Sequence, residues 1–576
     1  MDSPILGLNF GTHDAAAALV IDGAVAAAAE EERFSRSKQT KAFPTQAAAY
    51  CLREAGVEPG DIKRAALFVK PRLQLMLPLT NLRQAFPAAL GSTASDFGKY
   101  RSRSKAPDQI RSSGLVAEHC QIIPVRHHLA HAASAYLTSN FAHATVVTID
   151  GRGEYESCCI FEGRDGKLRR VHSVAYPHSI GYLYSMMTKY LGFRPQRDEY
   201  KVMGLAAYGS PSLVPVVREF AAFDGERGRL RLDLDYFDHH RRPSHARQLF
   251  SDKLIRLLGP ARSAYDPIDD HHRDIAFAVQ QLTEELVLGY VAFAQRLVPG
   301  DNLCMAGGVA LNAVANGAVI ESGIFKAIHI QPAANDAGTS VGAALVAASQ
   351  NLGKAPRWHM RSAFLGPAAS TTAVQAAISQ ARDQGCDVRT VDDPCRVGAE
   401  LLARNQIIGW VQGRMEFGPR ALGARSILAN PMHASNTSRV NALIKRREAF
   451  RPLAPAVLEE DGDDYFVLSE AGRSVYPFML ATAKVRPTQA EAIPAVVHQD
   501  GSARVQTVSR NTNPLMWGII DAFKCLTGVP VVLNTSFNDA DEPIVCTPVE
   551  AVRTFLACGL DALLIGDMLV TPRREQ

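Results

Sequence analysis

Two stretches of the chain show the same order of strand and turn signals, and this repetition limits the fold more than any other feature. Between residues 5 and 29, three apolar runs follow one another, with a tight turn at Asp22-Gly23. Between residues 144 and 174 the order recurs, with a turn at Asp165-Gly166. The predicted strands are Ile5–Asn9, Ala15–Ile21, Ala24–Ala29, Ala144–Ile149, Ser157–Phe161 and Lys167–Val174.

Helical stretches follow each copy, for example Thr45–Ala55, where Gly56 is expected to end the helix. Two meanders of three strands with helices predict an internally duplicated α/β domain. The nucleotide-binding fold shared by actin, sugar kinases and Hsp70 has this design, with ATP held between its halves. We therefore expect the N-terminal part of the chain to be an α/β domain that binds a nucleotide.

The length of 576 residues predicts more than one domain. The segment Asn351–Arg361 contains Gly353 and few apolar residues, so it is a predicted linker. We expect one domain over residues 1–355 and a second α/β domain over residues 362–576.

Two other segments, Arg72–Gly114 and Ser210–His271, have no clear periodicity and are predicted to be insertions. Insertions often determine substrate specificity, so these two segments are expected to contact the part of the substrate that is particular to this protein.

The composition is that of an ordinary globular protein and excludes several classes. Hydrophobic residues make up 47% and charged residues 21%, and the net charge of +4 predicts no nucleic-acid partner. No apolar run is long enough for a membrane span, and the start of the chain lacks the pattern of a signal peptide. The ten cysteines are scattered without a C-x-x-C pair, so we expect a cytoplasmic protein without a cysteine zinc site.

His127 and His131 form the first candidate site. The spacing of four residues in a helix-favouring stretch places both imidazoles on one helix face, where they can hold a divalent metal. Asp150, at a strand end, and Asp336, before a predicted helix, are candidates for the carboxylates that would complete the site. Such a set suits iron(II), manganese or zinc. The alternative is that these are surface or helix-capping histidines.

Three features point to a nucleotide or a reacting group. His13 follows the first strand and is a candidate general base or phosphate ligand, the alternative being a turn histidine. Gly307 and Gly308 follow the strand Leu303–Ala306 and leave room for a nucleotide to approach the backbone, although ordinary loops also contain such pairs. Asn312 is a candidate hydrogen-bond donor nearby.

The C-terminal third carries a second constellation, which predicts a site for a small phosphate. A glycine-rich turn spans Gly413–Gly423, and guanidinium groups match phosphate with paired hydrogen bonds. Asn and Ser side chains are expected directly after the predicted strand Val529–Leu533. Any single arginine can instead be an ordinary surface residue. The candidates are Arg420, Lys445, Arg451, Arg504, Asn534 and Ser536.

Several motifs, in order along nearly the whole chain, resemble the NodU/CmcH carbamoyltransferase family. They are HHLAHA, DGRGE, GGVALN, GRMEFGPRALGARSILANP at Gly413–Pro431, FRPLAP at Phe450–Pro455, DGSARVQTV at Asp500–Val508 and LNTSFN at Leu533–Asn538. The resemblance implies an N-terminal domain similar to the tRNA-modification protein TsaD and a C-terminal domain similar to YrdC. It also implies that carbamoyl phosphate and ATP form carbamoyl adenylate in the YrdC-like part, and that an acceptor hydroxyl attacks it in the TsaD-like part.

The resemblance also implies roles for individual residues. His13 matches a residue that assists removal of the acceptor proton, and iron(II) is the usual metal, with Mg²⁺ accompanying ATP. Residues that match metal ligands are His127, His131, Asp150 and Asp336. Residues at nucleotide positions are Lys38, Gly151, Gly153, Gly307, Gly308 and Asn312. Residues at carbamoyl-phosphate positions are Arg420, Arg451, Arg504 and Ser536, with Lys445 and Asn534 nearby.

We therefore expect an ATP-dependent O-carbamoyltransferase whose acceptor is a hydroxylated natural product such as a glycosylated antibiotic. A homodimer is the oligomeric state considered. Two alternatives are a small-molecule kinase of the actin-like fold and a nucleotide-binding partner in tRNA modification. A kinase would not need the arginine-rich C-terminal part, and the absence of a basic bias argues against RNA.

Overall fold

The computed structural model describes residues 4–87, 90–242, 248–352, 358–444 and 446–573. The chain forms two compact units, and we call them the N-terminal unit (Met1–Ala28 and Lys41–His359) and the C-terminal unit (Ala29–Thr40 and Met360–Gln576). The predicted division at residues 355 and 362 remains a prediction. In the described ranges, no helix combines the length and apolar character needed to span a bilayer.

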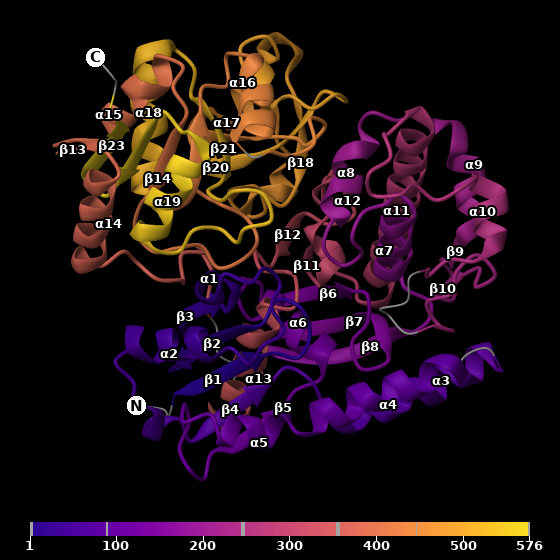
Figure 1. The fold of residues 1–576 in the computed structure, drawn as a ribbon. Coiled ribbons are helices and arrows are strands. Elements are labelled where there is room, and N and C mark those ends of the chain that lie inside the picture. Colours follow the sequence, from indigo (N-terminus) through magenta and orange to yellow (C-terminus); the bar gives the residue numbers. More distant parts are fainter. Residues whose placement is uncertain (1–3, 88–89, 243–247, 353–357, 445, 574–576) are drawn as a thin grey trace. The chain divides into compact units, whose positions relative to one another are not determined.

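Two five-stranded sheets with the same strand order form the N-terminal unit (Figure 1). In each, an antiparallel meander is followed by two parallel strands: the orders β3-β2-β1-β4-β5 and β8-β7-β6-β11-β12 are equivalent. This equivalence confirms the predicted duplicated α/β fold. The first sheet consists of β1 Ile5–Asn9, β2 Ala16–Ile21, β3 Ala24–Glu30, β4 Arg64–Leu67 and β5 Gln121–Pro124. The second consists of β6 His143–Ile149, β7 Glu156–Arg164, β8 Lys167–Ala175, β11 Asn302–Ala306 and β12 Ala327–Ile330.

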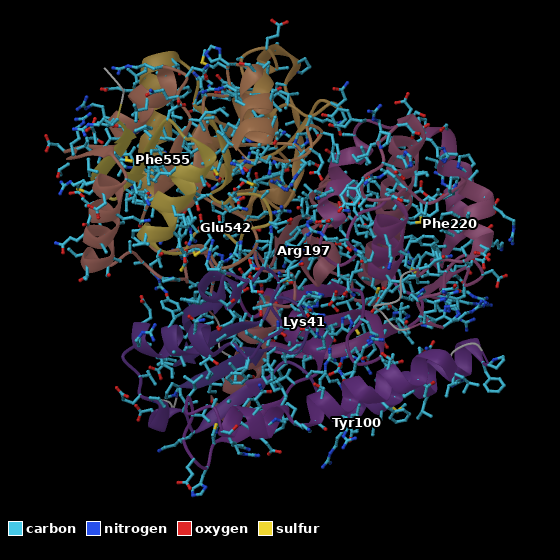
Figure 2. All side chains as sticks on the ribbon, in the orientation of Figure 1. Lys41, Tyr100, Arg197, Phe220, Glu542 and Phe555 are labelled. Atoms are coloured by element: carbon cyan, nitrogen blue, oxygen red, sulfur yellow. The ribbon has the colours of Figure 1, made fainter. Side chains whose placement is uncertain are left out.

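Helices cover and separate these sheets, and a small hairpin of β9 Ala221–Asp224 and β10 Arg229–Leu232 completes the unit. Phe220, next to that hairpin, is fully buried (Figure 2). The helices are α2 Thr45–Glu54, α3 Met76–Ala85, α4 Leu90–Ser104, α5 Ala106–Arg111, α6 His127–Tyr136, α7 Ile180–Tyr190, α8 Glu199–Ala206, α9 Val214–Val217, α10 Asp252–Leu258, α11 Asp270–Leu297, α12 Ala313–Glu321 and α13 Gly338–Leu352.

Helices α6 and α13 pack against each other between the two sheets. Helix α13 also packs on β1, β2 and β4, while α6 packs on β6 and β11. Glycines allow this close contact: a Cβ added at Gly342 would overlap the carbonyl oxygen of Ala130, and one at Gly7 would overlap that of Ser340. The two helices therefore approach closely enough to bring residues at their N-terminal ends together.

One eight-stranded mixed sheet is the centre of the C-terminal unit, in the order β13-β23-β22-β14-β15-β21-β16-β20. Phe555, in the helix α19 Pro548–Cys558, is fully buried and belongs to the core of this unit (Figure 2). The strands are β13 Cys386–Thr390, β14 Ile408–Val411, β15 Arg425–Ala429, β16 Ala454–Leu458, β20 Gln506–Val508, β21 Val531–Ser536, β22 Ala562–Ile565 and β23 Met568–Pro572. A three-stranded sheet consists of β17 Phe466–Val467, β18 Thr482–Val485 and β19 Ser502–Arg504. The helices are α14 Thr371–Asp383, α15 Pro394–Ala403, α16 Ser435–Ser438, α17 Gly462–Tyr465, α18 Pro514–Thr527 and α19 Pro548–Cys558.

The segment Ala29–Thr40, with the short helix α1 Glu32–Ser35, belongs to the C-terminal unit although it lies near the start of the chain. Arg36 ties the segment to the C-terminal unit, because its guanidinium donates to the carbonyl oxygens of Pro543 and Ile544 at 2.7 Å each. Phe34 contributes apolar contacts with the buried cluster Met415, Ala421, Ile544 and Cys546.

The observed strands follow the predicted ones closely in the N-terminal unit and differ at one functional point in the C-terminal unit. Asn534 and Ser536 were expected after a strand ending at Leu533, but they lie within β21. The strand continues because β15 pairs with it as far as Ser536 and β16 pairs with it as far as Asn534. The first predicted insertion, Arg72–Gly114, is mainly helical and lies between β4 and β5.

Gly342→Ala should destabilise the protein because its methyl group would enter the backbone of α6. We expect the free energy of unfolding to fall by about 1–3 kcal/mol, as for other overpacked interiors. Urea denaturation monitored by circular dichroism measures this. Gly60→Ala is the matched control, since no described atom lies within 4 Å of its added Cβ. Equal stability of the two variants would contradict the close packing of α6 and α13.

Candidate functional site

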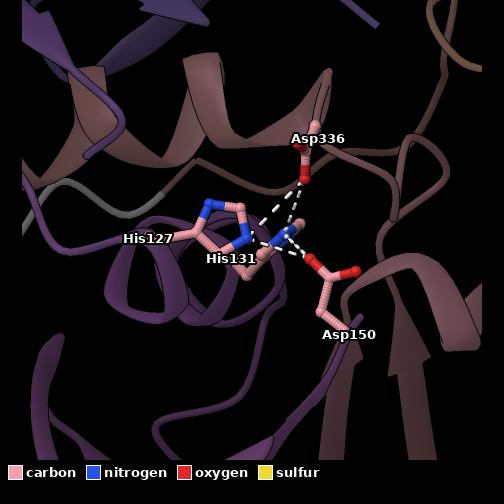
Figure 3. A group of neighbouring side chains, drawn as sticks. All are labelled: His127, His131, Asp150 and Asp336. Carbon is pink, nitrogen blue, oxygen red and sulfur yellow. Dashed lines mark hydrogen bonds and ion pairs between the residues drawn. The ribbon is translucent and has the colours of Figure 1, made fainter. Parts of the chain in front are cut away.

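Four buried side chains, His127, His131, Asp150 and Asp336, converge in the N-terminal unit (Figure 3). Oδ2 of Asp150 lies 2.9 Å from Nε2 of His127 and 3.2 Å from Nε2 of His131. Oδ1 of Asp336 lies 3.6 and 3.5 Å from the same two nitrogens. One ligand atom from each residue lies within 4.8 Å of all the others. The structure thus brings together the four residues that sequence reasoning selected.

The duplicated topology explains this convergence. Helix α6 follows β5, the last strand of the first sheet, and α13 follows β12, the last strand of the second sheet. His127 is the first residue of α6, and Asp336 lies two residues before α13. Asp150 comes directly after β6, the first strand of the second copy. The ligand atoms therefore come from helix and strand ends that the two repeats place at the same point.

Hydrogen bonds and nearby positive charges keep both carboxylates ionised despite their burial. Burial raises the pKa of Asp150, but hydrogen bonds from His127 and His131 outweigh it and hold that pKa well below its usual value. Burial opposes ionisation of Asp336 as well, yet the charges of His127 and His13 lower its pKa to about 2. Two ionised carboxylates thus face two imidazoles in an interior where an unbalanced charge would be costly.

Glu154 fixes the first residue of the histidine helix, and sequence reasoning did not select it. Its buried carboxylate accepts hydrogen bonds from the backbone N–H of His127, at 3.1 Å, and of Lys70, at 2.9 Å. A Cβ at Gly153 would lie 3.0 Å from Cδ2 of His127 and 2.9 Å from Cδ2 of His128. The DGRGE motif therefore positions the first turn of α6. The glutamate that follows Gly153 in the motif is the sequence feature that could have identified this role.

His128, between the two site histidines in sequence, has a different role. Its Nδ1 lies 2.8 Å from Oγ1 of Thr148, and its Nε2 lies 3.1 Å from the carbonyl oxygen of Glu156. Burial, with the nearby charge of His127, lowers the pKa of His128 to about 3, so it is a neutral residue that ties α6 to the second sheet. The four-residue spacing thus selected the two histidines that face Asp150, and His128 is not one of them.

His13 lies in the loop after β1, and Asp150 begins the equivalent loop after β6 in the second repeat. Its Nδ1 lies 2.9 Å from Oδ2 of Asp14. Burial lowers the pKa of His13, but the charge of Asp14 and those of Asp336 and Asp150 outweigh it and raise the pKa to about 10. His13 therefore lies within the electrostatic field of the buried carboxylates.

The glycines predicted to contact nucleotide surround Asp150. The backbone N–H of Gly151 donates to Oδ1 of Asp150 at 2.7 Å, and a Cβ at Gly308 would lie 3.2 Å from the same oxygen. Gly307 has a φ of +96°, and a Cβ there would overlap the carbonyl oxygen of Ile149. In this structure, Gly307 is therefore needed for the close approach of its loop to β6.

The other two predicted nucleotide residues have different surroundings. Asn312 caps α12 by accepting from the N–H of Ala315 at 3.0 Å, and its amide donates to Oε1 of Gln280 at 2.9 Å. Lys38 lies in the segment Ala29–Thr40 and so belongs to the C-terminal unit. The structure does not bring Lys38 together with the other five within one unit.

A cluster of arginines lies in the C-terminal unit. Burial, together with the charges of Arg420, Arg447 and Arg451, lowers the pKa of Arg504 well below its usual value. Burial also lowers the pKa of Arg420 to about 10. The charges of three arginines thus act on the guanidinium of Arg504, while a carboxylate oxygen of Glu448 lies 3.6 Å from Nη1 of Arg451. Guanidinium groups gathered in this way are able to attract an anion. The predicted Lys445 lies outside the described residues.

Arg447 was missed by sequence reasoning, although the basic run before Glu448 contained it. A π-helical turn at Arg439–Ile444 positions it, because Oδ1 of Asn441 accepts from Nε of Arg447 at 2.7 Å. The amide of the same asparagine donates to the carbonyl oxygen of Arg451 at 2.8 Å. One side chain in an irregular turn therefore fixes two of the four arginines.

Asn534 and Ser536 point from β21 in the same unit, since residues two apart in a strand share one face. The buried amide of Asn534 donates to Oε1 of Gln506 at 2.7 Å and to the carbonyl oxygen of Ala421 at 3.2 Å. Its Oδ1 has no hydrogen-bond partner among the described residues. Oγ of Ser536 donates to Oδ1 of Asn538 at 2.6 Å. Asn534 thus connects the strand to the loop that carries Arg420.

A buried carboxylate and a buried guanidinium hold that loop in shape. Oε1 of Glu416 accepts from the backbone N–H groups of Leu422, at 2.7 Å, and Ala424, at 2.8 Å. Arg425, with no exposed surface, donates to backbone carbonyl oxygens, including that of Gln412 at 3.1 Å. The loop therefore presents Arg420 from a rigid support.

Family models match both parts of the chain: a model described as the carbamoyltransferase N-terminus matches residues 4–345, and one described as the carbamoyltransferase C-terminus matches residues 399–572. The chain belongs to the carbamoyltransferase family, and it is a carbamoyltransferase enzyme.

Named relatives agree with this family. Nodulation protein NolNO of Sinorhizobium fredii is 38% identical over 98% of this chain and 80% of its own length. Nodulation protein NolO of Bradyrhizobium diazoefficiens is 39% identical over 78% of this chain and 79% of its own length. An uncharacterized protein of Synechocystis sp. is 36% identical over 99% of this chain and 98% of its own length. The similarity therefore extends through both units.

Glu416→Leu should destabilise the C-terminal unit because it leaves buried backbone N–H groups without an acceptor. We expect a loss of about 2 kcal/mol or more in the free energy of unfolding. Glu416→Gln should lose less, since its amide oxygen can still accept. Chemical denaturation of both variants measures the difference. If Glu416→Leu matches the unmodified protein in stability, Glu416 does not support the loop.

Proposed function

We propose that this carbamoyltransferase uses ATP and carbamoyl phosphate to make carbamoyl adenylate, and then transfers the carbamoyl group to a hydroxyl of a small natural product. The observation that carries the proposal is the group of four arginines formed by Arg504 with Arg420, Arg447 and Arg451. In the C-terminal unit of a carbamoyltransferase, a concentrated positive charge suits a donor that carries a phosphate. The family assignment favours this reaction over the kinase and tRNA-modification alternatives.

The arginine cluster would bind and orient the donor in this scheme. Arg420, Arg451 and Arg504 would hold the phosphate of carbamoyl phosphate, with Arg447 adding charge. Ser536 and Asn534 would supply the polar contacts from β21. Because the charges of Arg420, Arg447 and Arg451 act against that of Arg504, binding of an anion would relieve repulsion as well as form new hydrogen bonds. Water would release carbamate and phosphate from carbamoyl phosphate, and a carbamate oxygen would then attack the α-phosphorus of ATP, forming carbamoyl adenylate and releasing pyrophosphate.

The four converging residues in the N-terminal unit fit a divalent metal, which we propose to be iron(II). Two imidazoles and two ionised carboxylates are a donor set for such an ion. Nε2 of His127 and Nε2 of His131 face the carboxylate of Asp150, at 2.9 and 3.2 Å, so these two nitrogens are the ones placed to bind a metal. When bound, the metal would polarise the carbamoyl carbonyl and offset charge on the AMP leaving group.

His13 is proposed to receive the proton of the acceptor hydroxyl as that oxygen attacks the carbamoyl carbon. Despite burial, the carboxylates of Asp14, Asp336 and Asp150 raise the pKa of His13 to about 10, so its imidazole becomes a base only when a cation held by Asp150 and Asp336 offsets their charge. A positioned base contributes roughly 10²–10⁴-fold to such a step. Gly151, Gly153, Gly307, Gly308, Asn312 and Lys38 remain proposed nucleotide contacts, with Mg²⁺ accompanying ATP in the activation step.

Arg420→Ala should abolish the activation half-reaction, because it removes a cation from the donor site. We expect carbamoyl-phosphate-dependent formation of AMP and pyrophosphate from ATP to fall by about 10²-fold or more. Mass spectrometry of the nucleotides, without an acceptor, measures this. Arg404→Ala, at an exposed position of the same unit, is the control and should retain the rate. A normal rate for Arg420→Ala would refute the donor site, and release of ADP alone would favour a kinase.

His127→Ala should lose bound iron and carbamoyl transfer together, because the imidazole supplies one of four ligands. Elemental analysis of protein loaded under anaerobic conditions measures the metal. His119→Ala is the control, since His119 is exposed and lies outside the cluster. Unchanged metal content in His127→Ala would overturn the ligand assignment.

A further inference from the structure

A cavity lies within the N-terminal unit, and its lining includes Arg152, two residues after Asp150 of the buried histidine and carboxylate cluster. One wall comes from α4, in the first predicted insertion, through Asp96 and Lys99. Another comes from His239 and Arg242, in the second predicted insertion. The two segments of the chain with the least regular sequence pattern therefore contribute to the same cavity.

The charges that line this cavity are mainly positive. Nζ of Lys99 lies 3.6 Å from Oδ1 of Asp96, and Nη1 of Arg152 lies 3.8 Å from the same oxygen. One carboxylate thus faces two cations, and Asp96 is the single acidic residue among the described residues that line the cavity. Arg242 adds a third cation, although Asp238 lies 3.2 Å from its Nε. An additional anion would balance this excess.

The pKa of Lys99 also reflects the shortage of negative charge in the cavity. Burial, followed by the charge of Arg152, lowers the pKa of Lys99 to about 8, although Asp96 opposes the change. The ammonium group is therefore still mainly protonated at neutral pH, while it lacks full compensation. A bound oxyanion would supply that compensation.

Aromatic rings form the remaining wall of the cavity. Tyr182 and His239 stack with their centroids 5.4 Å apart, and Tyr176 meets both rings edge-on at 5.5 Å. The guanidinium of Arg152 lies 5.1 Å from the centroid of Tyr176. Burial lowers the pKa of His239 to about 4, so this wall is uncharged at neutral pH. It offers an apolar surface to a ring-shaped ligand.

Two residues that line the cavity, Arg152 and Tyr182, lie next to the backbone of the candidate metal site. Arg152 is two residues after Asp150, and the ring of Tyr182 lies 3.6 Å from where a Cβ of Gly151 would be. A ligand in the cavity would therefore lie next to the strand end that supplies a carboxylate to the cluster. This is the location that an acceptor hydroxyl would need.

We propose that this cavity binds the carbamoyl acceptor, and that the acceptor is a hydroxylated ring compound that carries a carboxylate or phosphate group. The identity of the ligand as an acceptor rests on the proposed carbamoyl transfer. The oxyanion contacts Lys99 and Arg152, and the ring packs on Tyr182. Cationic acceptors such as amino sugars are disfavoured because they would meet the excess positive charge.

Calorimetric titration of the full chain with four sugars of equal ring size tests this proposal. The probes are glucose, glucosamine, glucuronate and glucose 6-phosphate, so the last two separate carboxylate from phosphate recognition. At least one anionic probe should bind at least tenfold more tightly than glucose and glucosamine. Equal or tighter binding of glucose or glucosamine would overturn the proposal.

Variants locate that binding in the cavity. Lys99→Glu should weaken binding of the preferred anion at least tenfold, whereas Arg101→Glu, at an exposed position of the same helix, should not. Lys99→Gln and Arg242→Glu provide the same test if Lys99→Glu does not fold. Retained affinity in the cavity variants would refute the site.

The activation half-reaction is measured on the same unmodified protein, which separates the two proposals. If carbamoyl-phosphate-dependent AMP is absent while anion binding depends on Lys99, the proposed function fails and the anion site stands. If AMP forms while anionic sugars show no preference, the acceptor class fails and the proposed function stands.

Discussion

The carboxylate of Asp150 lies buried between the imidazoles of His127 and His131, and the structure of the N-terminal unit depends on this contact. A buried carboxylate requires compensation, and both imidazoles come from the first turns of one helix. That helix must approach the end of β6 closely, which the glycine at position 153 permits and the carboxylate of Glu154 fixes. The interaction therefore connects helix packing, loop sequence and site chemistry.

Duplication gives each repeat a share of the site. His13 and Asp150 follow the first strands of the two copies, while His127 and Asp336 come from the segments that follow the last strands. The repeats have diverged, so that equivalent positions carry different chemical groups. The insertions add to this common frame, because both line the cavity with cationic side chains. A shared architecture can thus keep the reaction while its acceptor changes.

Much of the N-terminal site could be predicted from the sequence because it lies at the ends of strongly apolar strands and at a four-residue helical spacing. Local patterns reveal such positions. They do not reveal Glu154 or Arg447, whose roles depend on approaches between distant segments. The membership of Lys38 in the C-terminal unit likewise depends on the contacts of Phe34 and Arg36. The strand containing Asn534 extends further than predicted because neighbouring strands pair with it on both sides.

Anomalous X-ray diffraction from crystals of iron-loaded protein, collected at the iron absorption edge, tests the central claim most directly. The account predicts one strong peak within bonding distance of Nε2 of His127 and His131 and of carboxylate oxygens of Asp150 and Asp336. A metal-loaded crystal with its anomalous peak elsewhere, and none among these four side chains, would contradict the account. The buried carboxylates would then serve only to hold the two repeats together.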